Sequence, residues 1–143
     1  MACKCYQKSS LEAITTRELA VNEGDYISFD INRIHTGTSI SHAEGSPVVR
    51  LNSAGLYLVS FDGDFTITTA GSVSVQLLNK GVAVPGVQDT VSGTTAVPRG
   101  LHFTTLINVM PNCCAVDNSA NLAVTISDAG TFSNANLTVV KMA

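Results

Sequence analysis

The stretch Gly-Leu-Tyr-Leu-Val-Ser-Phe-Asp-Gly-Asp-Phe-Thr-Ile, from Gly55 to Ile67, alternates between two kinds of side chain. Every second residue belongs to an apolar and aromatic set that one glycine interrupts: Tyr57, Val59, Phe61, Gly63, Phe65 and Ile67. A period of two is typical of a β-strand whose two faces differ. At roughly 3.3 Å per residue the stretch spans about 43 Å, which is long for a strand. We therefore expect a central strand that crosses the whole domain and buries the aromatic set in its core.

The opposite face of this predicted strand is mixed. Leu56 and Leu58 are too apolar for open solvent, whereas Asp62 and Asp64 are too polar for a core, and Ser60 lies between the two pairs. We expect this face to be apolar at one end and solvated at the other, as a subunit interface is.

The composition favours a β-rich, closely assembled protein. The 143 residues are enough for one domain with a substantial core. Charged residues make up 13%, about half the usual share, and small and polar residues dominate. The formal net charge is −3 without a block of Lys or Arg, which argues against nucleic acid as a partner. No apolar stretch is long enough to span a membrane, and the first residues lack the apolar core of a signal peptide, so we expect synthesis in a cytosol.

The rest of the chain predicts short strands separated by turns. The expected strands cover residues 26–31, 48–51, 72–78, 82–91, 101–109, 122–126 and 136–142. Asn79-Lys80-Gly81 predicts a tight hairpin turn in which glycine supplies a positive φ. Pro85-Gly86 predicts an edge strand or a bulge, because proline cannot donate to a β-ladder. Short strands at about ten-residue spacing are typical of a sandwich or jelly roll.

Two polar regions lie outside these strands. Residues 11–19 are compatible with a helical turn or an extended arm, and residues 32–46 with a long loop or an edge segment. We therefore place an N-terminal arm at residues 1–22 and an all-β jelly-roll domain at residues 23–143.

Three segments, in order, resemble the C1q/TNF-like jelly-roll superfamily. The segment 55–61 looks like its long central strand, 73–82 like the hairpin of the next two strands, and 132–141 like the closing strand. The resemblance covers residues 25–142. With Cys3 and Cys5 near the start and the adjacent pair Cys113 and Cys114 late in the chain, it is nearest to short bacterial and bacteriophage members. It implies a compact homotrimer.

The resemblance also implies a role for the second face of the central strand. In this superfamily the inner sheet lines the three-fold axis, so Leu56, Leu58 and Ser60 would meet their counterparts from two other chains. His102 lies on the outward face of the predicted strand 101–109, where we expect an interface or surface residue. The alternative is that a loop of the same domain covers the two leucines.

Asp62 and Asp64 share the outward face, so a trimer would bring six carboxylates towards its axis. Rings of carboxylates bind hard cations such as Ca²⁺ and repel one another when unfilled. An axial cation is therefore one hypothesis, and solvated aspartates turned outward are the alternative.

The four cysteines leave three alternatives open. Neither Cys3 with Cys5 nor Cys113 with Cys114 closes easily into an ordinary disulfide, so any bond joins the first pair to the second. The alternatives are free thiols, one or two disulfides, and a four-thiolate Zn²⁺ site. With the superfamily's strand order, all four thiols are expected at one pole of the molecule, together with both termini. We expect this pole to be the attachment end.

The sequence contains no nucleophile elbow, phosphate-binding glycine loop or His-Glu-x-x-His motif, and we expect no enzyme. No cofactor is expected beyond the candidate Zn²⁺ or Ca²⁺. The resemblance implies a structural protein: a trimeric decoration or head-fibre-type component of a bacteriophage virion surface, made in the host cytoplasm. Its expected partners are other virion proteins of the capsid or tail. The alternative is an adhesion or glycan-binding module on a bacterial cell or spore surface.

Overall fold

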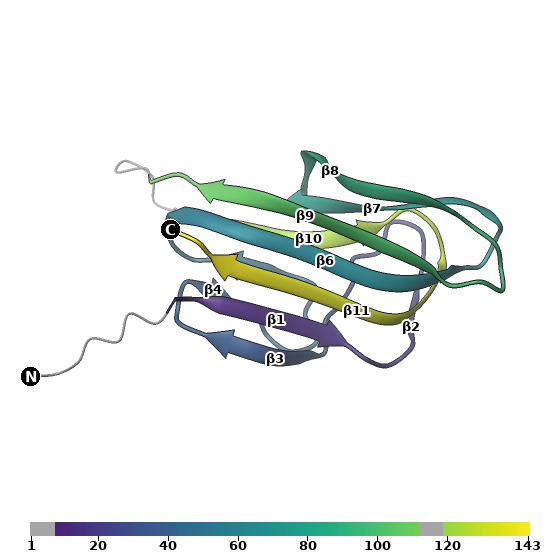
Figure 1. The fold of residues 1–143 in the computed structure, drawn as a ribbon, viewed down its shortest axis with the longest axis horizontal. Coiled ribbons are helices and arrows are strands. Elements are labelled where there is room, and N and C mark those ends of the chain that lie inside the picture. The colour runs from purple at the N-terminus through teal and green to yellow at the C-terminus, as the bar shows by residue number, and fades with distance from the viewer. Residues whose placement is uncertain (1–7, 112–118) are drawn as a thin grey trace, which may run out of the picture.

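The computed structural model describes residues 8–111 and 119–143, which form two antiparallel β-sheets packed face to face (Figure 1). Every regular element in these residues is a strand, so the expected all-β sandwich is confirmed. The strands are β1 (Ser10–Thr15), β2 (Leu19–Val21), β3 (Ile31–Thr36), β4 (Ile40–Ser41), β5 (Val49–Leu51), β6 (Gly55–Ile67), β7 (Gly71–Asn79), β8 (Val82–Gly93), β9 (Arg99–Val109), β10 (Ala120–Ile126) and β11 (Gly130–Lys141). Across the described ranges there is no helix with the length and apolarity that a membrane crossing needs.

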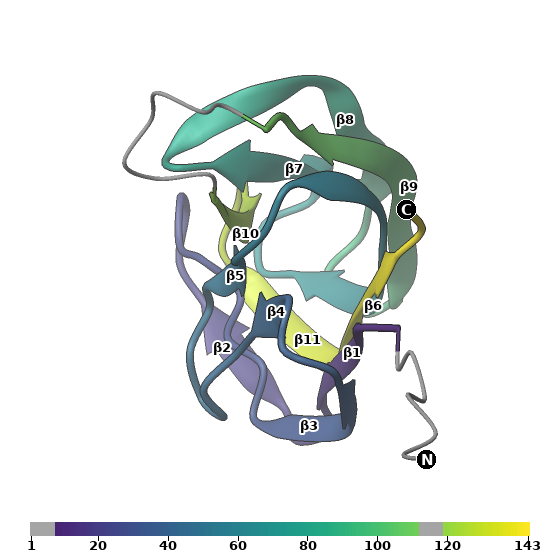
Figure 2. The same cartoon turned by 90° about the vertical axis from the view of Figure 1, so that its left-hand side faces the viewer.

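The two sheets have different strand orders. Sheet A runs β3-β1-β11-β6-β9, and β2 pairs with the start of β11; sheet B runs β4-β5-β10-β7-β8. Figure 2 looks at the molecule from the end that holds the C-terminus and shows the two sheets enclosing the core. In sheet A the last strand, β11, lies between β1 and the central strand β6, and β9 follows β6 at the edge.

The core lies between the sheets and is centred on β6. Tyr57, Val59 and Phe61 are completely buried, and Phe65 is 1% exposed. The other residues expected in this core are also buried: Val75, Leu77, Phe103, Ile107, Val124 and Val139. The alternation along β6 therefore assigned its two faces correctly.

The hairpin between β7 and β8 has the predicted turn. Lys80 and Gly81 both have a positive φ, 51° and 80°, as a two-residue type I′ turn requires. β8 is an edge strand of sheet B, and its pairing with β7 shifts register around the expected Pro85-Gly86 break. The amide of Gln76 donates to the carbonyls of Val84 and Val87 at 3.0 Å each, which holds the bulged segment against β7.

The predicted strand 26–31 is wrong. In this segment Tyr26 makes only an isolated bridge to Thr125, and the ladder with β1 is formed by β3. β3 is an edge strand of sheet A, so of the two alternatives for residues 32–46, a long loop or an edge segment, the edge segment is confirmed for this part. Ile27 and Phe29 are nevertheless completely buried, which explains the alternation. Alternation reports which side chains are buried, and it does not require that the backbone pairs with a neighbouring strand.

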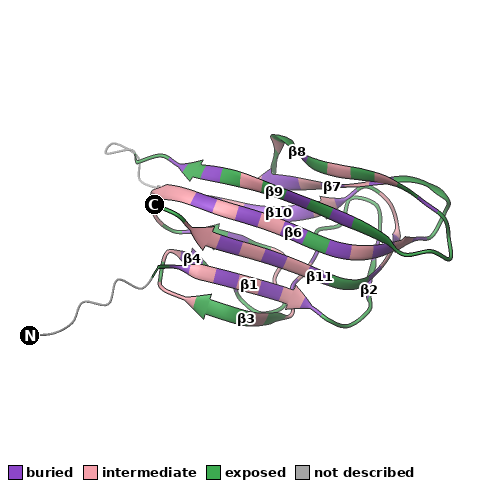
Figure 3. Ribbon diagram, viewed as in Figure 1, coloured by how far each residue is buried: buried purple, intermediate pink, exposed green. Residues whose placement is uncertain are grey.

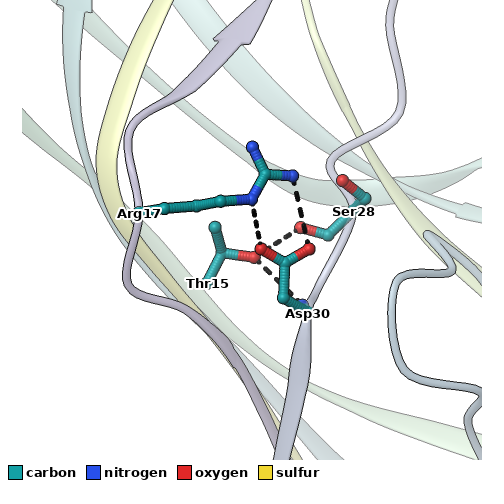
Figure 4. A network of polar contacts seen from close by, with 4 residues as sticks. All are labelled: Thr15, Arg17, Ser28 and Asp30. Atoms are coloured by element: carbon teal, nitrogen blue, oxygen red, sulfur yellow. Dashed lines mark hydrogen bonds and ion pairs between the residues drawn. The ribbon is translucent and has the colours of Figure 1, made fainter.

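The side chains of Thr15, at the end of β1, and Arg17, just after it, hold residues 28–30 in place (Figure 4). The buried hydroxyl of Thr15 donates to the carbonyl of Ser28 at 2.7 Å and accepts from the backbone N–H of Asp30 at 3.3 Å. The guanidinium of Arg17 binds the carboxylate of Asp30, with Nε and Oδ2 2.5 Å apart. The N–H of Asp30 also donates to the carbonyl of Ile14 at 3.0 Å, and the contact from Thr15 gives the carbonyl of Ser28 its partner.

The expected N-terminal arm also needs correction. β1 is an interior strand of sheet A, paired with β3 on one side and β11 on the other, and β2 pairs with β11. Residues 10–21 therefore belong to the sandwich and form neither a helical turn nor an arm. The part of the arm that carries Cys3 and Cys5 lies outside the described residues.

We expect that Phe61→Ala lowers the free energy of unfolding by roughly 3–5 kcal/mol, because it leaves a cavity among packed rings. Asp62→Ala is the matched control, since Asp62 is the next residue and is exposed on the other face. The measurement is chemical denaturation of both variants. A loss below about 1 kcal/mol for Phe61→Ala would contradict its place at the centre of the core.

Candidate functional site

The outer face of sheet A, which points away from sheet B, carries the residues predicted as an interface. Buried and partly exposed residues alternate along β6 (Figure 3), and Leu56, Leu58 and Ser60 are among those on the outward side. The antiparallel ladder places residues of β9 directly beside them: Leu106 is opposite Leu58, and Thr104 is opposite Ser60.

An apolar cluster occupies one end of this face. It consists of Leu56, Leu58, Leu106 and Val140. Leu58 lies at its centre, with Leu106 of β9 opposite it on one side and Val140 of β11 opposite it on the other. The leucines of β6 and Val140 are half-buried, whereas 56% of Leu106 is exposed. The interface predicted from the sequence does not include Leu106 or Val140. The alternation of β9 and β11 could have identified them, because it assigns both residues to the outward side. Met110 and Met142 are exposed just beyond the same strand ends.

The other end of the face is polar. Asp62 is exposed and lies opposite His102 of β9, whose side chain is 77% exposed. The backbone N–H of His102 donates to the carboxylate of Asp89 at 3.0 Å, and Asp64 accepts a hydrogen bond from Asn134 at 2.8 Å. Within the described residues of one chain, no three His, Cys, Asp or Glu side chains form a group that could hold a metal ion. The axial cation therefore depends on several chains meeting and stays a prediction.

A polar network crosses the same face beside the apolar cluster. Glu12 of β1 pairs with Arg33 of β3 and accepts a hydrogen bond from Asn136 of β11 at 2.7 Å. Thr138 in turn donates to the side-chain oxygen of Asn136 at 2.9 Å. The hydrogen bond from Arg33, helped by that from Asn136, lowers the pKa of Glu12 below its ordinary value. The network thus links three neighbouring strands through a carboxylate that is held ionised.

The strand directions bring four chain segments to one end of the molecule, which we call the proximal pole (Figure 1). There, Val109 at the end of β9 lies opposite Gly55, and Ser10 at the start of β1 lies opposite Val140. Ala143 accepts a hydrogen bond from the backbone of Leu56 at the same end. The four cysteines lie outside the described residues, so their gathering at this pole stays a prediction, but the described residues that flank them are at the expected end.

Comparison with solved structures identifies the architecture. The globular domain of zebrafish complement 1qA protein has a TM-score of 0.69 at 8% identity, over 95% of this chain and 98% of that chain. Eiger TNF from S. frugiperda gives 0.69 at 13% identity over 95% and 93%, and PRD1 vertex protein P5 gives 0.59 at 18% over 94% and 97%. No protein-family model and no curated protein sequence matches the chain. The expected C1q/TNF-like jelly-roll fold is confirmed; the bacterial or phage subtype stays a prediction.

Because the pKa of Glu12 is lowered on folding, its ionised form stabilises the protein. This contribution is complete above about pH 4.5, where an unperturbed glutamate titrates, and it is lost as the pH falls through the lowered pKa. We expect Glu12→Gln to lower the Tm at pH 7 by about 2–4 °C and to have no effect near pH 2. The measurement is thermal unfolding across this pH range.

Glu23→Gln serves as the control, since Glu23 has no hydrogen bond or ion pair to another described residue and its removal should leave the pH profile unchanged. A Tm difference between Glu12→Gln and the natural protein that stays constant from pH 7 to pH 2 would contradict the role of the Glu12 charge.

Proposed function

We propose that the chain is a non-enzymatic structural protein that forms a homotrimer on the surface of a bacteriophage virion. The observation that carries this proposal is the apolar cluster at one end of the outer face of sheet A, on a fold shared with complement, TNF and phage vertex proteins. In this proposal the protein is made in the host cytoplasm and joins other virion proteins of the capsid or tail.

The apolar cluster has the character of a surface that another chain covers. Single exposed apolar residues are normal, but here three strands contribute adjacent side chains around Leu58, and Leu106 is more than half exposed. A three-fold axis beside β6 would bring three copies of the cluster together. At about 25 cal/mol per Å², covering a few hundred Å² of apolar surface contributes several kcal/mol. An isolated chain would then be folded but less stable than the trimer.

The polar end of the face supports the same arrangement. Hydroxyl pairs such as Ser60 and Thr104, whose oxygens are 3.3 Å apart, suit the wet rim of an interface. Further along β6, three copies of Asp62 and Asp64 would approach the axis together. A hard cation such as Ca²⁺ would relieve their repulsion, which makes the pair a candidate axial site in the trimer.

The two poles of the sandwich suggest its orientation. Both described chain ends and the segments that flank the four cysteines lie at the proximal pole, whereas the opposite end, which we call the distal pole, is formed by connecting loops. We propose that the proximal pole attaches to the virion and that the distal pole faces outward.

We expect light scattering after gel filtration to give three times the chain mass of 14.9 kDa. Leu106→Asp should convert this species to monomers, because an interface would bury three carboxylates without partners. Leu106 is exposed in the single chain, so the substitution should not disturb its core. Val97→Asp is the matched control, since Val97 is 44% exposed in the β8–β9 loop and should leave the trimer intact. A monomer at micromolar concentration, or a trimeric Leu106→Asp variant, would refute the proposed interface.

The virion assignment is tested by mass spectrometry of phage particles from the source bacterium, purified on a density gradient. We expect the protein to be present in a fixed ratio to the major capsid protein. Recovery only in a washed cell-envelope or spore-coat fraction would overturn the virion assignment and favour the bacterial surface module.

A further inference from the structure

A hollow of about 490 Å³ lies at the distal pole, where the outer face of sheet A ends. Four segments that are far apart in the sequence form it: the β1–β2 connection, the end of β6, the β8–β9 loop and the start of β11. Its polar lining consists of Glu18, Thr66, Thr68, Thr95, Thr131 and Ser133. Thr66 and Thr131 lie directly opposite each other in the β6–β11 ladder, so they form a fixed pair at its base.

These polar groups are free to bind a ligand. Ser133 makes one long hydrogen bond, 3.4 Å to the carbonyl of Asp64. Among the described residues, the side chains of Glu18 and the four threonines have no partner within the protein. The lining therefore offers five hydroxyl groups and one carboxylate, and it includes neither lysine nor arginine.

A second hollow of about 210 Å³ continues from the first around the distal pole. The two share Ile67 and Thr68, and the second adds Thr69 and the carboxylates of Glu23 and Asp128. Together they form a furrow whose lining carries three carboxylates and no lysine or arginine.

We propose that this furrow binds a neutral saccharide. Hydroxyl groups both donate and accept hydrogen bonds, and a carboxylate accepts from two neighbouring hydroxyls at once, so the lining matches a ligand that consists mainly of hydroxyl groups. An anionic ligand would meet Glu18, Glu23 and Asp128 without a compensating cation. A metal ion alone is not the expected ligand, because within the described residues no three His, Cys, Asp or Glu side chains gather closely enough to hold one.

The furrow is shallow and its lining contains no aromatic ring, so one copy binds weakly. In the proposed trimer, three furrows face outward at the same pole, and their combined binding to a glycan-covered surface is stronger than that of one copy. This gain, and the outward orientation, rest on the proposed function; the furrow itself belongs to a single chain.

Saturation-transfer NMR on the full chain tests the proposal with three neutral probes: maltotriose, cellotriose and chitotriose. The anionic probe is 3′-sialyllactose and the basic peptide probe is trilysine. We expect transfer to at least one neutral trisaccharide and none to the other two probes. Thr131→Val and Glu18→Gln should each weaken this binding by about tenfold without changing the shape of the hollow: the first removes a hydroxyl, and the second removes the negative charge and replaces one accepting carboxylate oxygen with an amide that donates. Thr90→Val is the matched control, since Thr90 is exposed on β8 away from the furrow.

The absence of transfer to all three neutral probes overturns the proposal, as does equal binding by Glu18→Gln and Thr131→Val. Stronger transfer to 3′-sialyllactose or to trilysine also overturns it, in favour of an anionic or a basic ligand. Light scattering on the same samples separates this result from the trimer. A trimer without saccharide binding refutes the furrow alone, and saccharide binding by a monomer refutes the trimer alone.

Discussion

Phe61 is the centre of an aromatic cluster that joins three strands of sheet A to the segment containing Phe29. Its ring lies 5.6 Å from that of Phe103 on the neighbouring strand, 6.3 Å from Phe132 at the start of β11, and 6.5 Å from Phe29 in the segment without a ladder. The one glycine of this face leaves space for the rings: a Cβ on Gly63 would lie 3.1 Å from both Phe61 and Phe132. The aromatic core therefore favours glycine where the apolar pattern of β6 is interrupted, because a side chain there would make the neighbouring rings shift by a few tenths of an ångström.

The candidate interface is a consequence of this core. Because successive residues of a strand point to opposite faces, burying Phe61 turns Leu58 and Asp62 outward. The register between β6 and β9 then decides their neighbours, with Leu106 beside Leu58 and His102 beside Asp62. A slip of one residue would reverse both faces of β6 and remove the apolar cluster from the surface.

Antiparallel pairing decides which chain segments lie at each end of the molecule. β1 and β6 run towards the distal pole, whereas β9 and β11 run back, so the chain termini and the segments that flank the cysteines share the proximal pole. The hydroxyl-lined furrow lies at the opposite end. Attachment and ligand binding, as proposed, would therefore not compete for the same surface.

The sequence by itself determined the bounds of β6, the two-residue turn at Lys80 and Gly81, and the buried face of the central strand, because these depend on local periodicity and on backbone preferences. It also identified Leu58 as an interface candidate. Only the tertiary structure decided that residues 10–15 are an interior strand, that their ladder partner begins at Ile31 and continues through β3, and that Leu106 completes the apolar cluster. The furrow, too, became apparent only from the tertiary structure, because its residues come from segments far apart in the sequence. The reason is physical: alternation records the environment of each side chain, whereas a ladder partner or a hollow depends on backbone segments that are distant in the sequence.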